Sequence, residues 1–154
     1  MISFFKHSLN KNKNYIKNTL KSPYLTSGPV CEKAEGMLKN KFKKKYAILT
    51  NSWTNGLIAI LLSLKLKKTD EIIIPACTFV ACANVIEMIG AKVVFADIDN
   101  STKLMDINDC LKKITKNTKV IMPVHLYGNL FPTKILKKKI RKNIIIVEDS
   151  AHAF

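Results

Sequence analysis

Residues 144–147 constrain the fold most, because they form a run of β-branched side chains after a lysine-rich helical pattern. Such a run predicts a strand buried on both faces, as in the parallel sheets of α/β proteins. Asp149 stands at the carboxyl end of this strand, where open α/β sheets bind ligands. A buried carboxylate needs a partner. That partner is either a cationic ring nitrogen of a cofactor or, more commonly for a strand-end carboxylate considered alone, a lysine or the helix that follows.

The same alternation of strand and helix patterns runs through most of the chain. Strands are predicted at residues 46–50, 71–74, 91–96, 119–124 and 144–148. Helices are predicted within residues 1–22 and at 30–45, 57–66, 79–89, 106–114 and 132–142. The apolar stripe of the 30–45 helix contains Val30, Ala34, Met37, Leu38 and Phe42, and Ile135, Leu136 and Ile140 are predicted to point inward from the last helix. This order predicts an α/β fold with a largely parallel sheet.

The formal charge of +15 suggests nucleic-acid binding, but the residue types argue against it. Every basic residue except Arg141 is a lysine, whereas a phosphate-reading surface usually carries arginines. No GxGxxG motif is present, which disfavours a dinucleotide-binding module. A basic α/β nucleotide- or nucleic-acid-binding module without catalysis therefore remains only the alternative hypothesis.

The cysteines indicate neither a disulfide framework nor a metal site, because none forms a CxxC pair or lies at ligand spacing from a histidine. Cys77 and Cys82 lie in apolar contexts and are predicted to be small buried side chains. No secretory signal and no apolar run of membrane-spanning length is found. We therefore expect a cytoplasmic protein.

Polar and aromatic residues follow several of the predicted strands. Ser52 and Thr54 begin a helix whose N-terminus suits a phosphate, although an ordinary N-cap explains them as well. Phe79, which follows Thr78, can stack on a flat ring or pack in the core. His125 follows the fourth predicted strand, where a lone histidine is most often structural.

These sites share one location, since all of them lie at carboxyl ends of predicted strands. Together with Asp149 they provide a phosphate cradle, a stacking aromatic, a histidine and a carboxylate for a ring nitrogen. That combination is what pyridoxal 5′-phosphate (PLP) requires, because the carboxylate keeps the pyridine nitrogen protonated and the ring can then stabilise a carbanion.

The chain also resembles the DegT/DnrJ/StrS family of PLP-dependent sugar-nucleotide aminotransferases. The resemblance runs in order from about residue 12 to the end of the chain, and the ordered set of motifs is specific to that family. The motifs are LTSGP at 25–29, TNSWTNG at 50–56, DEIIIP at 70–75, TFVACAN at 78–84, PVHLYG at 123–128 and EDSAHA at 148–153.

The resemblance implies a role for each site residue. Asp149 would pair with the pyridine nitrogen, His152 would lie near the ring hydroxyl, and Phe79 would stack on the ring. The phosphate would be held by the backbone around Ser52, Trp53 and Thr54 and by the Thr54 hydroxyl. Trp53 stands where the family has a small residue, and Cys82 stands where threonine is frequent.

The resemblance further implies a three-layer sandwich, the N-terminal part of the type I aminotransferase large domain. It implies transfer of an amino group, usually from glutamate, to a keto-sugar nucleotide in cell-surface or secondary-metabolite sugar biosynthesis, by a homodimer. We expect residues 1–29 to form an N-terminal helix and loop and residues 30–154 a partial PLP-binding domain. In the family the Schiff-base lysine follows a Ser-Phe motif well downstream of the Glu148-Asp149 stretch, and no such motif follows that stretch in this sequence. We therefore expect an incomplete N-terminal fragment that is inactive by itself.

Overall fold

The computed structural model describes residues 13–153, and the chain divides into two units, Met1–Leu49 and Thr50–Phe154. The first unit contains α1 (Lys13–Leu20) and α2 (Pro29–Phe42), which confirms both predicted helices. The apolar stripe predicted for α2 is largely exposed, because Val30, Met37 and Phe42 are 61%, 65% and 45% exposed. None of the side chains described in this unit is buried, so the stripe has no core to join. The domain boundary expected at residue 30 remains a prediction.

The predicted strand at residues 46–50 is also wrong. This segment has no regular secondary structure and pairs with no strand among the described residues. Tyr46 and Ile48 are 71% and 81% exposed. An apolar, β-branched segment becomes a strand only when a neighbour accepts its backbone hydrogen bonds, and the described part of the chain supplies none.

The second unit is built on a parallel sheet with strand order β2-β1-β3-β4. Its strands are β1 (Glu71–Pro75), β2 (Lys92–Ala96), β3 (Thr118–Ile121) and β4 (Ile145–Ile146). Its helices are α3 (Trp53–Ser63), α4 (Ala81–Met88), α5 (Ile107–Lys112), the 3₁₀ turn η1 (Leu126–Gly128) and α6 (Thr133–Lys139). These elements confirm the predicted α/β alternation, although α3 begins four residues earlier than expected because Ser52 caps it.

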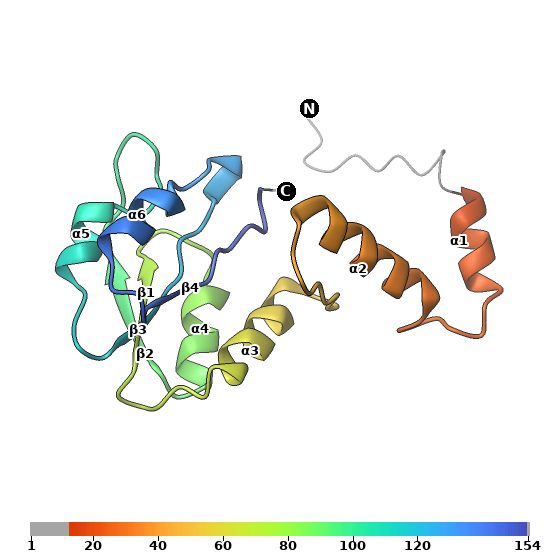
Figure 1. The fold of residues 1–154 in the computed structure, drawn as a ribbon, viewed down its shortest axis with the longest axis horizontal. Helices are drawn as coiled ribbons and strands as arrows, with labels where there is room; N and C mark the ends of the chain where they lie inside the picture. The colour runs from red at the N-terminus through yellow and green to blue at the C-terminus, as the bar shows by residue number, and fades with distance from the viewer. Residues whose placement is uncertain (1–12, 154) are drawn as a thin grey trace. The chain divides into compact units, whose positions relative to one another are not determined.

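Helices cover both faces of this sheet. The chain moves across the sheet in one direction from β1 to β2 and in the opposite direction from β2 to β3 and β4. Because connections between parallel strands are right-handed, α4, between β1 and β2, is expected on one face of the sheet, and α5 and α6 on the other. In Figure 1, α3 and α4 lie together on one side of the strands and α5 and α6 on the other. These three layers confirm the predicted sandwich. No helix of the described region is long and apolar enough to cross a membrane.

The core is centred on β1 and β3, the inner strands of the sheet. Their isoleucines and Val120 are fully buried, together with Leu61 from α3, Ile86 from α4 and Leu136 from α6. The expectation that residues 144–147 are buried on both faces is wrong for Ile145, which is 43% exposed. The reason is that β4 lies at the edge of the described sheet, where β3 is its one neighbouring strand. Ile135 is likewise 51% exposed, because α6 turns Leu136 toward the core in its place.

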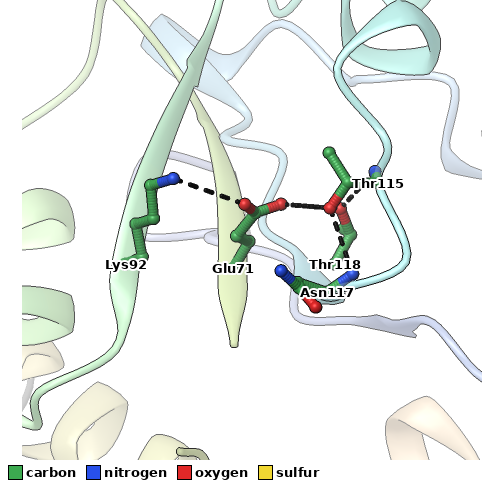
Figure 2. Close-up of polar contacts among 5 residues, drawn as sticks. All are labelled: Glu71, Lys92, Thr115, Asn117 and Thr118. Atoms are coloured by element: carbon green, nitrogen blue, oxygen red, sulfur yellow. Dashed lines mark hydrogen bonds and ion pairs between the residues drawn. The ribbon is translucent and has the colours of Figure 1, made fainter. Parts of the chain in front are cut away.

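The buried carboxylate Glu71 connects the amino-terminal ends of the three strands β1, β2 and β3 (Figure 2). Its Oε2 atom accepts hydrogen bonds from the hydroxyls of Thr115 at 2.5 Å and Thr118 at 3.5 Å. The Nζ atom of Lys92 lies 3.5 Å from Oε1, but the lysine side chain is 65% exposed. The register of β1 against β3 shifts directly after Glu71, which pairs with Thr118.

We expect Glu71→Ala to lower the free energy of unfolding by about 2 kcal/mol, because hydrogen bonds to a buried charged group are lost. Lys92→Ala should lower it by less than about 1 kcal/mol, since an exposed ion pair contributes little. Urea denaturation measures both values. Equal losses for the two variants would contradict the assignment of the stabilisation to the threonine hydroxyls.

Candidate functional site

A cavity of about 410 Å³ opens at the carboxyl ends of the strands of the second unit. Its lining comes from four separate parts of the chain: the start of α3, the loop after β1, the segment after β3 and the segment after β4. The lining residues are Trp53, Thr54, Cys77, Thr78, Phe79, Val124, Leu126, Tyr127, Asp149, Ala151 and His152. A volume of this size suits a small cofactor. Five of the six predicted site residues therefore meet in one place.

Asp149 is a buried part of the cavity wall, with 4% of its surface exposed. Its backbone continues the parallel ladder beyond β4: its N–H donates to Pro123 O at 2.9 Å, and its carbonyl accepts from His125 N at 2.9 Å. Its Oδ1 atom accepts from the N–H of Ala151 at 2.9 Å. No lysine or arginine of the described region forms an ion pair with it, which removes one of the two structural explanations for this carboxylate.

The N-terminus of α3 forms another part of the cavity. Ser52 is the N-cap, and its hydroxyl oxygen accepts from Asn55 N at 3.1 Å. Ser52 does not line the cavity, so the ordinary capping role explains its side chain. Trp53 and Thr54 do line it, and neither backbone N–H donates to a partner within residues 13–153. Unpaired N–H groups at the positive end of a helix dipole favour an anion.

Phe79 is 67% exposed and faces the cavity, so packing in the core does not explain it. It lies in the loop between β1 and α4 next to Thr78 and Cys77, which also line the cavity. The expectation that Cys77 is a buried side chain is wrong, because it is exposed. The strand ends at Pro75, and the loop then turns its side chains toward the opening instead of the core.

The two histidines near the strand ends have different surroundings. His125 is buried and does not line the cavity; its Nδ1 accepts from Phe131 N at 2.9 Å, and its Nε2 lies 3.7 Å from Glu148 Oε2. The structural explanation of His125 is therefore correct. His152 lines the cavity, and its Nδ1 accepts from Tyr127 N at 3.3 Å.

Tyr127 is a lining residue for which the sequence suggested no role. Its ring stacks on His152 with centroids 5.8 Å apart and an interplanar angle of 18°. Its backbone is left-handed, with φ 54°, and Gly128 follows with φ 83°. An L-residue with positive φ is uncommon and is often found at functional sites. The available signal was the glycine directly after it, which marks a tight turn at the end of a strand pattern.

Cys82 lies behind Asp149, at the start of α4. It is fully buried, and its Sγ lies 3.6 Å from Asp149 Oδ2 and 3.3 Å from Thr78 Oγ1. Burial, together with the negative charge of Asp149, raises the pKa of the Cys82 thiol to about 11, although the Thr78 hydrogen bond opposes the shift. The thiol therefore keeps its proton at neutral pH and acts as a donor.

Comparison with known proteins identifies this arrangement. The model of the DegT/DnrJ/EryC1/StrS aminotransferase family matches residues 7–154. GDP-perosamine synthase of Escherichia coli O157:H7 is 36% identical over 146 residues, which are 94% of this chain and 40% of that protein. The chain thus spans about two fifths of the length of the curated relatives it matches.

Solved structures agree with the sequence comparison. Spr1654 of Streptococcus pneumoniae in its PLP form matches with a TM-score of 0.86 at 33% identity, over 91% of this chain and 40% of that one. GDP-4-keto-6-deoxymannose-3-dehydratase with a trapped PLP-glutamate geminal diamine also matches with a TM-score of 0.86, at 30% identity, over 92% of this chain and 38% of that one. These likenesses confirm the predicted fold class.

Proposed function

The chain belongs to the DegT/DnrJ/EryC1/StrS aminotransferase family, and from this premise we propose that its cavity is the N-terminal part of a PLP site that serves an aminotransferase. The observation that carries the proposal is the convergence of Trp53, Thr54, Phe79, Asp149 and His152 on one cavity from three distant parts of the chain. When bound, PLP supplies a protonated aromatic ring that stabilises negative charge on the substrate carbon.

The residues of the cavity fit this cofactor in charge and shape. The unpaired N–H groups of Trp53 and Thr54, with the Thr54 hydroxyl, would bind its phosphate. Phe79 presents an exposed ring for stacking. Asp149, buried and without a basic partner in the part of the chain that the structure describes, would keep the proton on the ring nitrogen. We assign Ser52 to holding the helix end and not to direct contact.

His152 would orient the side of the ring that carries the hydroxyl. Its Nδ1 atom already accepts the Tyr127 N–H, so Nε2 is the atom left to face a ligand. The stack with Tyr127 holds the imidazole in place. A neutral imidazole with an acceptor at Nδ1 carries its proton at Nε2, and it would therefore donate to the ring oxygen.

For the complete enzyme we propose transfer of an amino group from glutamate to a keto-sugar nucleotide. The name of the relative GDP-perosamine synthase and the glutamate adduct trapped in the solved dehydratase support these two substrate classes. We further propose a homodimer in the cytoplasm. No comparison favours the alternative of a basic nucleic-acid-binding module.

No lysine lines the cavity among the residues that the structure describes. We therefore propose that the lysine that attaches PLP covalently comes from a segment outside residues 1–154, and that this chain alone does not complete the reaction. The many lysines of the chain complicate tests with PLP itself, because its aldehyde condenses with exposed amines. Pyridoxamine 5′-phosphate has no aldehyde and is the appropriate probe.

The experiment is a fluorescence titration of the chain with pyridoxamine 5′-phosphate. Trp53 is the only tryptophan and lines the cavity, so we expect saturable quenching. Pyridoxamine, which lacks the phosphate, should bind at least roughly tenfold more weakly, because charge-assisted hydrogen bonds at the helix end are lost. Thr54→Val, which keeps the side-chain shape, should reduce this difference. Equal affinities for the two probes would contradict the assignment of the phosphate to the end of α3.

Reduction with borohydride after incubation with PLP serves as the companion test of the lysine proposal. Peptide mass spectrometry should find labels scattered over many lysines, each below stoichiometry. One stoichiometric phosphopyridoxyl-lysine within the chain, together with turnover, would show that the covalent site lies in residues 1–154.

A further inference from the structure

The side chains of Thr78, Cys82 and Asp149 form a chain of hydrogen bonds at the back of the cavity. Thr78 follows β1, Cys82 belongs to α4 and Asp149 follows β4, so the contacts join three elements. The Thr78 Oγ1–Cys82 Sγ distance is 3.3 Å, and the Cys82 Sγ–Asp149 Oδ2 distance is 3.6 Å. Cys82 is fully buried, and Thr78 and Asp149 line the cavity.

The direction of these hydrogen bonds follows from the number of protons available. An ionised carboxylate only accepts, so the thiol must use its single proton to donate to Asp149. The sulfur is then left as an acceptor, and the Thr78 hydroxyl must donate to it. The order is therefore Thr78 O–H to Cys82 Sγ, and Cys82 S–H to Asp149 Oδ2.

We propose that Cys82 is a positioning residue that, with Thr78 behind it, orients the Asp149 carboxylate toward the ring nitrogen of the cofactor. The Ala151 N–H holds Oδ1 and the Cys82 thiol holds Oδ2, so the carboxylate is fixed at both oxygens. Each oxygen keeps a further lone pair for a ligand in the cavity. This inference rests on the proposed cofactor, but the hydrogen bond itself can be tested without it.

The first measurement is the S–H stretching band of Cys82, obtained as the infrared difference between the full chain and its Cys82→Ser variant. We expect a lower frequency than for a free thiol, because donation to a carboxylate weakens the S–H bond. When the same difference is taken in the Asp149→Asn background, the S–H band should lie at a higher frequency than in the wild-type chain. In the Asp149→Ala background the band should lie at a higher frequency still. A band that is unchanged in both backgrounds would overturn the inference.

The second measurement is the affinity for pyridoxamine 5′-phosphate from Trp53 fluorescence. Cys82→Ala should weaken binding roughly fivefold, the size of one lost hydrogen bond, and Cys82→Ser should restore it. In the Asp149→Asn background Cys82→Ala should have no further effect, because Cys82 acts through Asp149. Additive losses, or a serine variant as weak as the alanine variant, would assign Cys82 to packing and overturn the positioning role.

The two measurements separate this inference from the proposed function. A chain that shows the expected band shifts but binds no pyridoxamine 5′-phosphate would overturn the cofactor assignment and uphold the orientation of Asp149 by Cys82. A chain that binds the probe without any band shift would uphold the cofactor and overturn the role of Cys82.

Discussion

Asp149→Asn is expected to raise the dissociation constant of pyridoxamine 5′-phosphate roughly 100-fold, about 3 kcal/mol, because it removes one partner of a buried charge pair. The asparagine keeps the shape and the Oδ1 acceptor for the Ala151 N–H, so the fold should be retained. Quenching of Trp53 fluorescence measures the change. The effect should exceed that of any other single substitution in the cavity, since Asp149 is the only Asp, Glu, Lys or Arg that lines it among residues 13–153.

Glu148→Gln is the matched control. The same neutralisation is made one residue earlier, on a side chain that is 42% exposed and does not line the cavity. Its affinity for the probe should stay within about twofold of the wild-type value, because an exposed charge is well screened. Equal losses for the two variants would mean that general charge, and not a specific contact at Asp149, attracts the ligand.

The largest effect on stability is expected for Ile73→Ala, a loss of about 4 kcal/mol in the free energy of unfolding. Ile73 is fully buried in β1, which has a neighbouring strand on each side and helices on both faces. Truncation leaves a cavity that this surrounding structure cannot fill. Urea denaturation should show a lower midpoint with little change in slope.

Ile145→Ala provides the comparison on the edge strand. The side chain is 43% exposed, and within residues 13–153 β4 has a neighbouring strand on one side only, so we expect a loss of about 1 kcal/mol or less. A loss as large as that of Ile73→Ala would contradict the burial of these two residues and the strand order derived from it.

Local patterns were enough to predict most elements of the second unit. The capping residues explain why. Ser52 accepts a hydrogen bond from Asn55 N–H and begins α3, and Asp106 accepts one from Asp109 N–H and begins α5. Gly90 provides the positive φ after α4. These signals are encoded within a few residues of each helix end.

The errors concern residues whose state depends on a distant partner. The segment at residues 46–50 has the composition of a strand, but strand formation requires a neighbour, which no local pattern supplies. The exposure of Ile145 depends on the place of β4 in the strand order, and that of Val30 and Met37 on what lies against α2. Hydrophobicity indicated where burial is favourable, not whether a covering element is present.

The candidate site was predictable because its residues follow strands, and parallel strands bring their carboxyl ends to one edge of the sheet. Asp149, Phe79 and Thr54 were found in this way. Tyr127 and the Cys82–Asp149 contact were not, because a left-handed backbone and a hydrogen bond across 67 residues leave no periodic pattern. The resemblance to a family, and not spacing, was what singled out His152.

The central claim is that Asp149 holds the proton on the ring nitrogen of the bound cofactor. It is tested most directly by nitrogen-15 NMR of pyridoxamine 5′-phosphate labelled at that nitrogen and bound to the chain. We predict that the bound ring keeps its proton to a higher pH than the free compound, because the carboxylate favours the charged form, and that Asp149→Asn abolishes this difference. A bound ring nitrogen that loses its proton at the same pH as in free solution, in wild type and variant alike, would contradict the account.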